Sequence, residues 1–264
     1  MIDSVGNVGS VLLLGGTSDI GLAVLARLTG PRLSRVVLAG RPSATLDRAG
    51  ELIRNSGVAN VEVRAFDASD RAAHQALVDS VFDAGDIDVA IFAVGAVGGS
   101  AAGVGTHDAP ALDSVAIARG IDTNLAGVAS CSTQVAARMR AQGHGTIVIF
   151  TAAAPGRPAR RLAANNLGFE ASQAGLDSFA LGLAASLRGS GARLLLIRLG
   201  RVPTRLGTEL DAGLAAGARS APLAQPADVA NAVAAAIRSK RSAVIYVPPS
   251  ARSAAWGARI VRHR

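Results

Sequence analysis

A glycine-rich segment near the start of the chain has the residue types needed to bind phosphate. It reads VLLLGGTSDIGLAVL (11–25) and places Gly15 and Gly21 around the junction between an apolar run and a helical pattern. Gly15 permits a tight turn, Gly21 allows close packing of a helix on a sheet, and the free N–H groups at the helix start can hold a pyrophosphate. Thr17 and Ser18 add hydroxyl donors. The alternative is a plain turn between a strand and a helix.

Two charged residues follow the next apolar runs and could contact the rest of a dinucleotide. Arg41 comes directly after the second run, in LAGRPS, where a carboxylate would favour the ribose hydroxyl of NAD(H). An arginine suits the 2′-phosphate of NADP(H) instead, so we expect NADP(H) rather than NAD(H). The alternative for Arg41 is an ordinary exposed arginine. Asp67 follows the third run, in FDAS, and either contacts the adenine edge or caps the next helix.

Groups that could move a proton or bind a further phosphate are few. His107 lies in the loop after the fourth apolar run, and His144 lies in a turn expected at the opposite edge of the sheet. Histidine titrates near neutral pH, so His107 is the candidate acid and His144 is not. Arg160 and Arg161 lie in an Arg-rich loop after the fifth run. They either bind a phosphate through paired N–H groups or form a solvated basic loop.

Composition argues against several other kinds of site and partner. The one cysteine, Cys131, excludes an internal disulfide framework, and the four histidines lack metal-binding spacings, so we expect no metal site. The net charge is +8, but aromatic residues are only 3% of the chain, so base-stacking platforms and a nucleic-acid partner are not expected. Asp3 and the short apolar runs predict neither a signal peptide nor a membrane span, and hence a cytoplasmic location.

The elements that must position these residues alternate regularly along the chain. Short apolar runs bounded by Gly or Asp are typical of parallel strands covered on both faces, and helical patterns lie between them. The alternation predicts an α/β fold: one Rossmann-type domain (1–250) with a doubly wound parallel sheet of about seven strands and helices on both faces, followed by a basic tail (251–264). The expected strands are 11–14, 35–39, 61–66, 88–94, 146–151, 193–199 and 243–247. The expected helices are 19–29, 43–56, 70–83, 111–141, 167–189 and 226–239.

Six short segments, taken in order, resemble a known enzyme family. GGTSDIG, FDAS, FAVG, NLAG, FEASQAGLDSF and LGRVPT are similar to motifs of the short-chain dehydrogenase/reductase (SDR) family over nearly the whole chain. The resemblance implies a Rossmann fold that binds NAD(P)(H), with further cofactor contacts at Ile20, Ala68 and Gly95. The segments VLLLGGTSDIGLA, DIDVAIFAVG, RMRAQGHGTIV and QAGLDSFALGL resemble one actinobacterial branch. Its members reduce a decaprenylphosphoryl 2-keto-pentose that a flavoprotein oxidase supplies.

The resemblance maps the family's catalytic Asn, Ser and Tyr-x-x-x-Lys onto four positions. Asn124, in NLAG, keeps the Asn that positions a water in the proton relay. Phe169 stands where the family has the proton-donating Tyr. Gln173 stands where it has the Lys that lowers the pKa of that Tyr and holds the nicotinamide ribose. Ala152 stands at the position of the Ser that orients the carbonyl.

Three observations bear on this mapping. Thr151 and Ala153 are alternative positions for the Ser, because the loop after the strand is long. The only Tyr and the only Lys, Tyr246 and Lys240, form no Tyr-x-x-x-Lys pair in any register. Asp19 stands where the family prefers Gly, and a carboxylate there would weaken dinucleotide binding unless it turns away from the pyrophosphate.

These replacements predict an NADP(H)-binding protein of polyprenyl-phosphate sugar metabolism that is weakly active or non-catalytic. Loss of a positioned acid costs about 10²–10⁴-fold in rate. The alternatives are a working NADPH-dependent reductase with rearranged acid catalysis in cell-wall arabinan synthesis, and an interaction scaffold that binds no nucleotide. Expected partners are a second copy of the chain or a flavoprotein oxidase, and the expected ligand is a lipid-phosphate sugar. The tail either rests on an anionic membrane through Trp256 and its arginines or is frayed.

Overall fold

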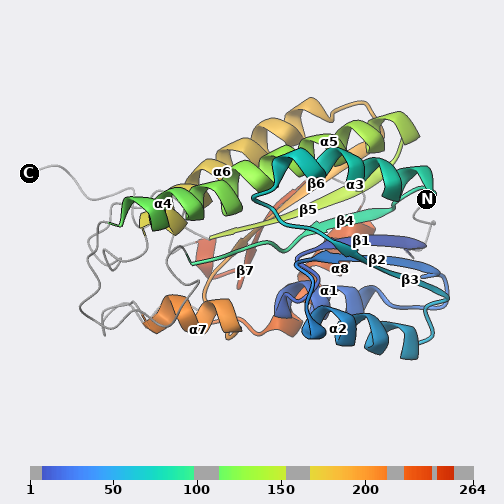
Figure 1. Cartoon of the computed structure of the whole chain (residues 1–264), viewed down its shortest axis with the longest axis horizontal. Helices are drawn as coiled ribbons and strands as arrows, with labels where there is room; N and C mark the ends of the chain where they lie inside the picture. Colours follow the sequence, from blue (N-terminus) through green and yellow to red (C-terminus); the bar gives the residue numbers. More distant parts are fainter. Residues whose placement is uncertain (1–7, 98–112, 153–166, 213–222, 240–242, 253–264) are drawn as a thin grey trace, which may run out of the picture.

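One parallel sheet lies at the centre of the molecule (Figure 1). The computed structural model describes residues 8–97, 113–152, 167–212, 223–239 and 243–252, and within them seven strands pair in the order β3-β2-β1-β4-β5-β6-β7. The strands are β1 (Ser10–Leu14), β2 (Arg35–Gly40), β3 (Asn60–Ala65), β4 (Val89–Phe92), β5 (Gly145–Ala152), β6 (Ala192–Leu199) and β7 (Ala243–Val247). The helices are α1 (Asp19–Leu28), α2 (Ala44–Asn55), α3 (Arg71–Asp83), α4 (Ser114–Ile121), the π-helical segment η1 (Asp122–Gly127), α5 (Val128–Gln142), α6 (Leu167–Ser186), α7 (Arg205–Ala212) and α8 (Pro226–Ser239).

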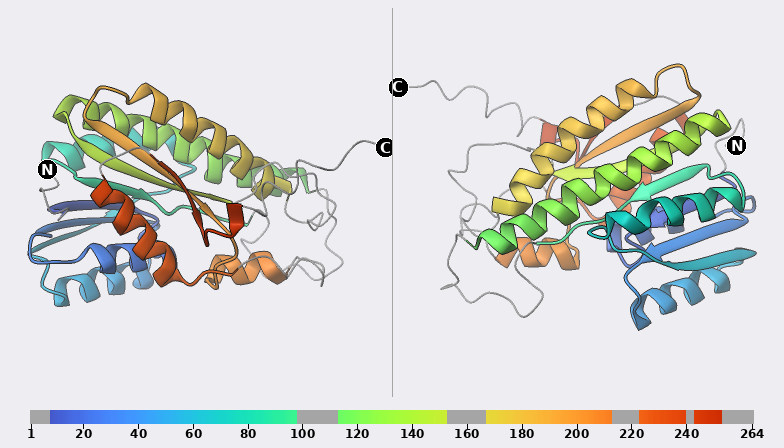
Figure 2. Two further views of the ribbon diagram at one scale, coloured as in Figure 1. Left: turned by 180° about the vertical axis from the view of Figure 1, so that it is seen from behind. Right: turned by 45° about the horizontal axis from the view of Figure 1, so that its top comes forward.

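Helices cover both faces of the sheet, and each face has its own apolar core (Figure 2). Alternate strand side chains point to opposite faces. In β1, Val11 and Leu13 pack with residues of α1, α2 and α8, while Leu12 and Leu14 pack with residues of α3, α5 and α6. Strands buried on both sides need continuous apolar sequence, and this is why the runs of the sequence mark the strands so clearly.

The strand order reverses between β1 and β4, which pair in parallel with each other. In such sheets, ligands bind outside the carboxyl ends of the strands at this switch point. The turn after β1 and the segment after β4 meet there. The predicted doubly wound Rossmann-type architecture with seven strands is confirmed.

Two helical features differ from the sequence prediction. The helix expected over 111–141 is divided into α4, η1 and α5, and the middle part has the wider π-helical hydrogen bonding. π-helical turns inside longer helices are frequent at functional sites. The helix α7 was not predicted at all; it follows β6 and lies near the carboxyl ends of the strands (Figure 1). No helix in the described part of the chain has the length and apolarity to cross a membrane.

Candidate dinucleotide-binding and active site

The glycine-rich turn after β1 is shaped by two close backbone approaches. Gly15 has φ +86°, and a Cβ there would lie 2.4 Å from the carbonyl oxygen of Ala93. Its N–H donates to the carbonyl of Ala39 at 2.9 Å, so the turn is held between the ends of β2 and β4. A Cβ on Gly21 would lie 2.7 Å from the side chain of Leu13. Backbone contact and a positive φ thus require glycine at position 15, and Gly21 lets α1 pack closely on β1, as the sequence predicted for that residue.

The start of α1 presents the groups expected at a phosphate site. The Ser18 hydroxyl oxygen accepts from the N–H of Gly21 at 3.2 Å and caps the helix, which leaves the hydroxyl proton free to donate. Thr17 and Ile20, on either side, are half-buried. The carboxylate of Asp19 has a protein partner: one of its oxygens accepts a hydrogen bond from the backbone N–H of Arg205 at 2.9 Å.

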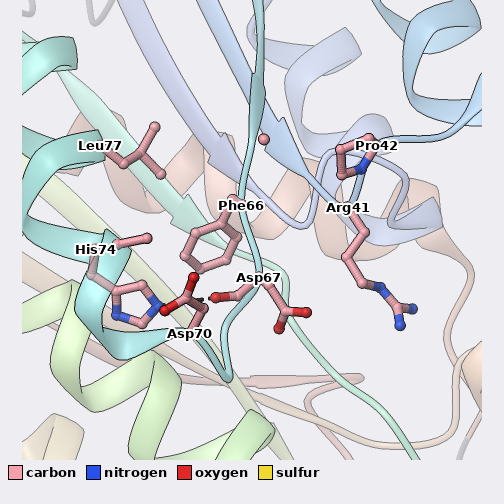
Figure 3. Close-up of a pocket in the computed structure, with 9 residues that line it drawn as sticks. Arg41, Pro42, Phe66, Asp67, Asp70, His74 and Leu77 are labelled. Carbon is pink, nitrogen blue, oxygen red and sulfur yellow. Dashed lines mark hydrogen bonds between the residues drawn. The ribbon is translucent and has the colours of Figure 1, made fainter.

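A pocket of about 210 Å³ lies beyond the ends of β2 and β3 (Figure 3). The side chains of Arg41 and Asp67 extend from its two sides, and Phe66 and His74 form part of its wall. Arg41 is exposed, so its guanidinium is available to a ligand. The pocket places together the two charged residues that the sequence associated with the adenosine end of a dinucleotide.

Asp67 does not cap α3, which was one of its two predicted roles. Its Oδ1 accepts from the N–H of Ser69 at 2.9 Å and from the Ser69 hydroxyl at 2.7 Å. These hydrogen bonds, helped by the charge of Arg41, lower the pKa of Asp67. The residue at the cap position of α3 is Asp70, whose side chain makes no capping hydrogen bond. Asp67 is thus a fixed, ionised carboxylate at the mouth of the pocket.

The wall behind Asp67 contains a buried histidine that sequence reasoning missed. His74 is fully buried; its Nε2 lies 3.2 Å from the carbonyl oxygen of Asp67 and its Nδ1 lies 3.2 Å from the Ser130 hydroxyl. Its ring packs on Phe66 with 5.3 Å between centroids. A lone histidine within a helical pattern carries no sequence signal that it joins two segments of the chain. It holds the segment after β3 against α5.

The segment after β3 also touches the π-helical segment. A Cβ on Gly127 would lie 2.0 Å from the carbonyl oxygen of Ala68, and Ala68 itself is buried. Only glycine fits there without a shift of one backbone. The contact fixes the height of η1 above the sheet and hence the position of Asn124.

Asn124 is fully buried and binds the segment after β4. Its Oδ1 accepts from the N–H of Ala96 at 2.8 Å and its Nδ2 donates to the Ala96 carbonyl at 2.8 Å. Nδ2 also donates to the Ser172 hydroxyl at 3.3 Å, and that hydroxyl donates to the carbonyl of Phe169 at 2.7 Å. Asn124 therefore joins the segment after β4, in which Gly95 precedes Ala96, to Ser172 of α6.

The three positions that the sequence mapped onto the family's Ser, Tyr and Lys lie together where β5 ends against α6. Phe169 and Gln173 are one helical turn apart on α6, and both are buried. The Gln173 Oε1 accepts from the N–H of Ala152, the last residue of β5, at 3.0 Å. The family's Lys has no acceptor and could not make this bond. The glutamine side chain thus ties the end of β5 to α6.

A second polar cluster lies one turn further along α6. Asp177 receives two hydrogen bonds of 2.7 Å from the guanidinium of Arg198 in β6, and one of 3.2 Å from the Thr151 hydroxyl. Arg198 also donates to the hydroxyl of Tyr246 at 2.6 Å. Thr151, the alternative Ser position, is buried with its hydroxyl bound to Asp177. The only tyrosine of the chain is part of this cluster.

Two other titratable residues, Glu170 and His144, lie at opposite edges of the sheet. Glu170, next to Phe169, is half-buried, and burial raises the pKa of its carboxyl. His144 precedes β5 at the amino edge of the sheet, with its Nε2 3.5 Å from Asp88 and 3.6 Å from Asp86. The sequence placed His144 at this far edge, and the structure confirms it.

Several predicted residues cannot be placed in this site. His107, Ala153, Arg160 and Arg161 lie outside the described residues, as does the tail from 253 onward. Among the residues that the structure describes, no group of three or more His, Cys, Asp or Glu side chains could hold a metal ion. The buried thiol of Cys131 has its pKa raised to about 12 by desolvation, so it is a core residue rather than a ligand.

Comparison with known proteins gives consistent results. Residues 10–215 match the model of a family described as short chain dehydrogenase. An uncharacterized oxidoreductase of Streptomyces coelicolor is 37% identical over 93% of this chain and 90% of its own length. The cis-4-hydroxycyclohexanecarboxylate dehydrogenase of Sinomonas cyclohexanicum is 30% identical over 84% of this chain and 86% of its length. Among solved structures, a variant of actinorhodin polyketide ketoreductase with NADPH has a TM-score of 0.76 at 24% identity, covering 96% of this chain and 99% of that chain.

Proposed function

Because this chain belongs to the short-chain dehydrogenase family, we propose that it binds NADP(H) at the glycine-rich turn and that it reduces carbonyl groups weakly or not at all. Its substrate, if turned over, is a keto sugar on a polyprenyl phosphate. The proposal places it in the cytoplasm, beside the flavoprotein oxidase that makes such keto sugars, as a non-catalytic or slow partner.

The cofactor part of the proposal is supported by the turn and the pocket. The capped start of α1 offers free N–H groups and a hydroxyl to a pyrophosphate. Arg41, exposed beside the pocket at the ends of β2 and β3, offers a guanidinium to a 2′-phosphate. The structural relative with the TM-score of 0.76 carries NADPH.

One observation carries the catalytic part: the Gln173 carboxamide is bound to the Ala152 N–H. A proton donor is needed beside the carbonyl oxygen during hydride transfer. At the mapped positions, Phe169 has no acidic hydrogen and Gln173 has no charge. A positioned nicotinamide could still transfer hydride slowly by proximity alone.

The test is a titration of the purified protein with NADPH and NADH, by calorimetry and by thermal unfolding. NADPH at about 100 Kd should raise the free energy of unfolding by about 2.7 kcal/mol, and NADH at the same concentration should do less. Arg41→Ala should raise the Kd of NADPH by about tenfold to a hundredfold and leave that of NADH unchanged, because a hydrogen bond to a charged group is worth about 1.5–3 kcal/mol.

The matched control is Arg140→Ala, which removes one exposed charge near the end of α5. It should change neither affinity. If neither nucleotide binds the wild-type protein, the cofactor proposal is wrong. The alternative hypothesis, an interaction scaffold that binds no nucleotide, then takes its place. Rapid NADPH-dependent reduction of a polyprenyl-linked 2-keto sugar would contradict the catalytic part.

A second candidate is a working reductase with rearranged acid catalysis. Its candidate acid, His107, lies outside the described residues; the half-buried Glu170, whose pKa is raised by burial, adjoins Phe169 in the sequence but points about 100° away from it around α6. The 30% identical relative is named as a dehydrogenase of a hydroxycyclohexane carboxylate, which makes ring ketones a second substrate class to assay. Turnover with either substrate separates this candidate from the non-catalytic one.

A further inference from the structure

Asp19, the acidic residue in the glycine-rich turn, is held on both of its oxygens by one residue of α7. Oδ2 accepts from the backbone N–H of Arg205 at 2.9 Å, and Oδ1 lies 3.3 Å from the Arg205 Nη2. The same Nη2 donates to the carbonyl of Thr17 in the turn. We call these contacts the Asp19–Arg205 clasp.

The clasp gives α7 a defined place on the carboxyl edge of the sheet. Arg205 is the first residue of α7, so Asp19 satisfies one of the helix N–H groups that has no partner within the helix. On the other side, a Cβ on Gly95 would lie 2.9 Å from the side chain of Leu206. The start of α7 therefore touches both the turn after β1 and the segment after β4, the two segments that flank the switch point.

The charges of Asp19 and Arg205 affect how the turn binds an anionic ligand. An unpaired carboxylate in the first turn of α1 would compete with a pyrophosphate for the same N–H groups and repel it. Arg205 brings a positive charge to that carboxylate, so the pair is neutral towards the ligand. The side chains of Arg205 and Asp19 are 62% and 35% exposed. Exposed ion pairs contribute little to folding stability, so the effect should be seen in binding rather than in stability.

We propose that Arg205 is a positioning residue for dinucleotide binding: it neutralises Asp19 and fixes the start of α7 beside the pyrophosphate. The inference rests on the proposed NADP(H) binding and adds Arg205 to that site. Arg205 is 188 residues away from Thr17 in the sequence, yet it contacts the turn directly. Asp19, a departure from the family's glycine, becomes compatible with a nucleotide only together with Arg205.

The experiment measures the Kd of NADPH for the wild-type protein, Arg205→Ala, Asp19→Asn and the double variant. Asn keeps an oxygen for the Arg205 N–H but removes the charge. Arg205→Ala should raise the Kd roughly threefold to tenfold, because it exposes the Asp19 charge to the phosphates. Asp19→Asn should not raise it, and the double variant should return to within about twofold of the wild type.

Three controls separate charge from structure. The increase in Arg205→Ala should shrink as ionic strength rises, since salt screens exposed charges, whereas a packing defect would not respond. Adenosine 2′-monophosphate, which lacks the pyrophosphate, should bind all four proteins equally. Arg205→Lys should recover part of the lost affinity.

The outcomes are distinct. An unchanged Kd in Arg205→Ala, with the wild type binding NADPH, would overturn the inference and leave the proposed function standing. A double variant as weak as Arg205→Ala would also overturn it, because neutralising Asp19 would then not be the role of Arg205. A wild-type protein that binds neither NADPH nor adenosine 2′-monophosphate would remove the proposed function, and the inference with it.

Discussion

At the scale of single residues, the polar side chains at two of the mapped catalytic positions have structural partners. Asn124 uses its amide oxygen and nitrogen on the backbone of Ala96, and Gln173 uses its oxygen on the N–H of Ala152. Each bond joins a strand end to a helix at the edge where catalysis would take place. The polar groups are therefore engaged in holding the site together.

The Gln173 bond can be tested by removing its acceptor. Gln173→Leu keeps a similar size but leaves the Ala152 N–H without a partner, so the free energy of unfolding should fall by about 1–3 kcal/mol. Gln173→Glu keeps an acceptor oxygen and should retain more stability. Chemical denaturation of the three proteins measures the difference. Equal stability of Gln173→Leu and wild type would mean that the bond has no structural role.

The same bond bears on any attempt to restore catalysis. A Phe169→Tyr/Gln173→Lys variant would recover the family's pair but lose the acceptor for the Ala152 N–H. Motif spacing aligns Gln173 with the Lys position as a prediction. It could not show where the amide oxygen binds, because that depends on how far β5 extends beside α6. The capping of α1 by Ser18 and the local turn of Asp67 are set by backbone geometry in the same way.

At the scale of elements, η1 is located by its contact with the segment after β3. A Cβ on Gly127 would lie 2.0 Å from the Ala68 carbonyl oxygen, which is backbone and cannot rotate away. Gly127→Ala should therefore destabilise the fold by about 1–3 kcal/mol, since overpacking forces backbone shifts. Gly182→Ala, in α6 with open space around the site, is the matched control and should stabilise by about 0.5–1 kcal/mol. Thermal unfolding of both variants gives the two signs.

Those opposite signs are the critical result. Stabilisation by Gly127→Ala would mean that η1 can move away from Ala68 at no cost.

The sequence predicted most elements well, because strands buried on both faces leave uninterrupted apolar runs. It missed α7, since RLGTELDA has eight residues and an internal Gly207, and a helix this short depends on contacts from elsewhere. Asp19 and Gly95 supply such contacts from other parts of the chain.

At the scale of the whole molecule, net charge adds a long-range term to nucleotide binding. The chain carries a formal charge of +8, which should attract anionic ligands. The Kd of NADPH should rise with salt between about 0.01 M and 1 M ionic strength, where the Debye length falls from roughly 30 Å to 3 Å. NADH has one phosphate fewer and should show a weaker dependence. Parallel salt dependence of the two nucleotides, measured by calorimetry, would contradict a role for Arg41 at a 2′-phosphate.

The overall topology followed from the sequence because few arrangements satisfy a strict strand–helix alternation. Right-handed crossovers and a parallel sheet leave the doubly wound order as the natural solution, and the order β3-β2-β1-β4-β5-β6-β7 agrees with it. The substrate-binding side of the site is less directly predictable from the sequence. Its expected phosphate ligands, Arg160 and Arg161, lie outside the described residues, so the substrate class depends on the binding and turnover experiments.

The π-helical segment makes the active edge sensitive to chain length. A π-helical turn holds one residue more than the α-helical turn it replaces, so 122–127 acts as a built-in insertion between α4 and α5. Deleting one residue there would restore a continuous α-helix and leave α4 and α5 close to their present relation, because the wider turn already absorbs the extra residue. Since Cys131 and Met139 keep α5 anchored in the core, the change would fall on the residues inside the segment and turn Asn124 away from Ala96. In this helix, losing a residue is a larger change for the site than replacing one.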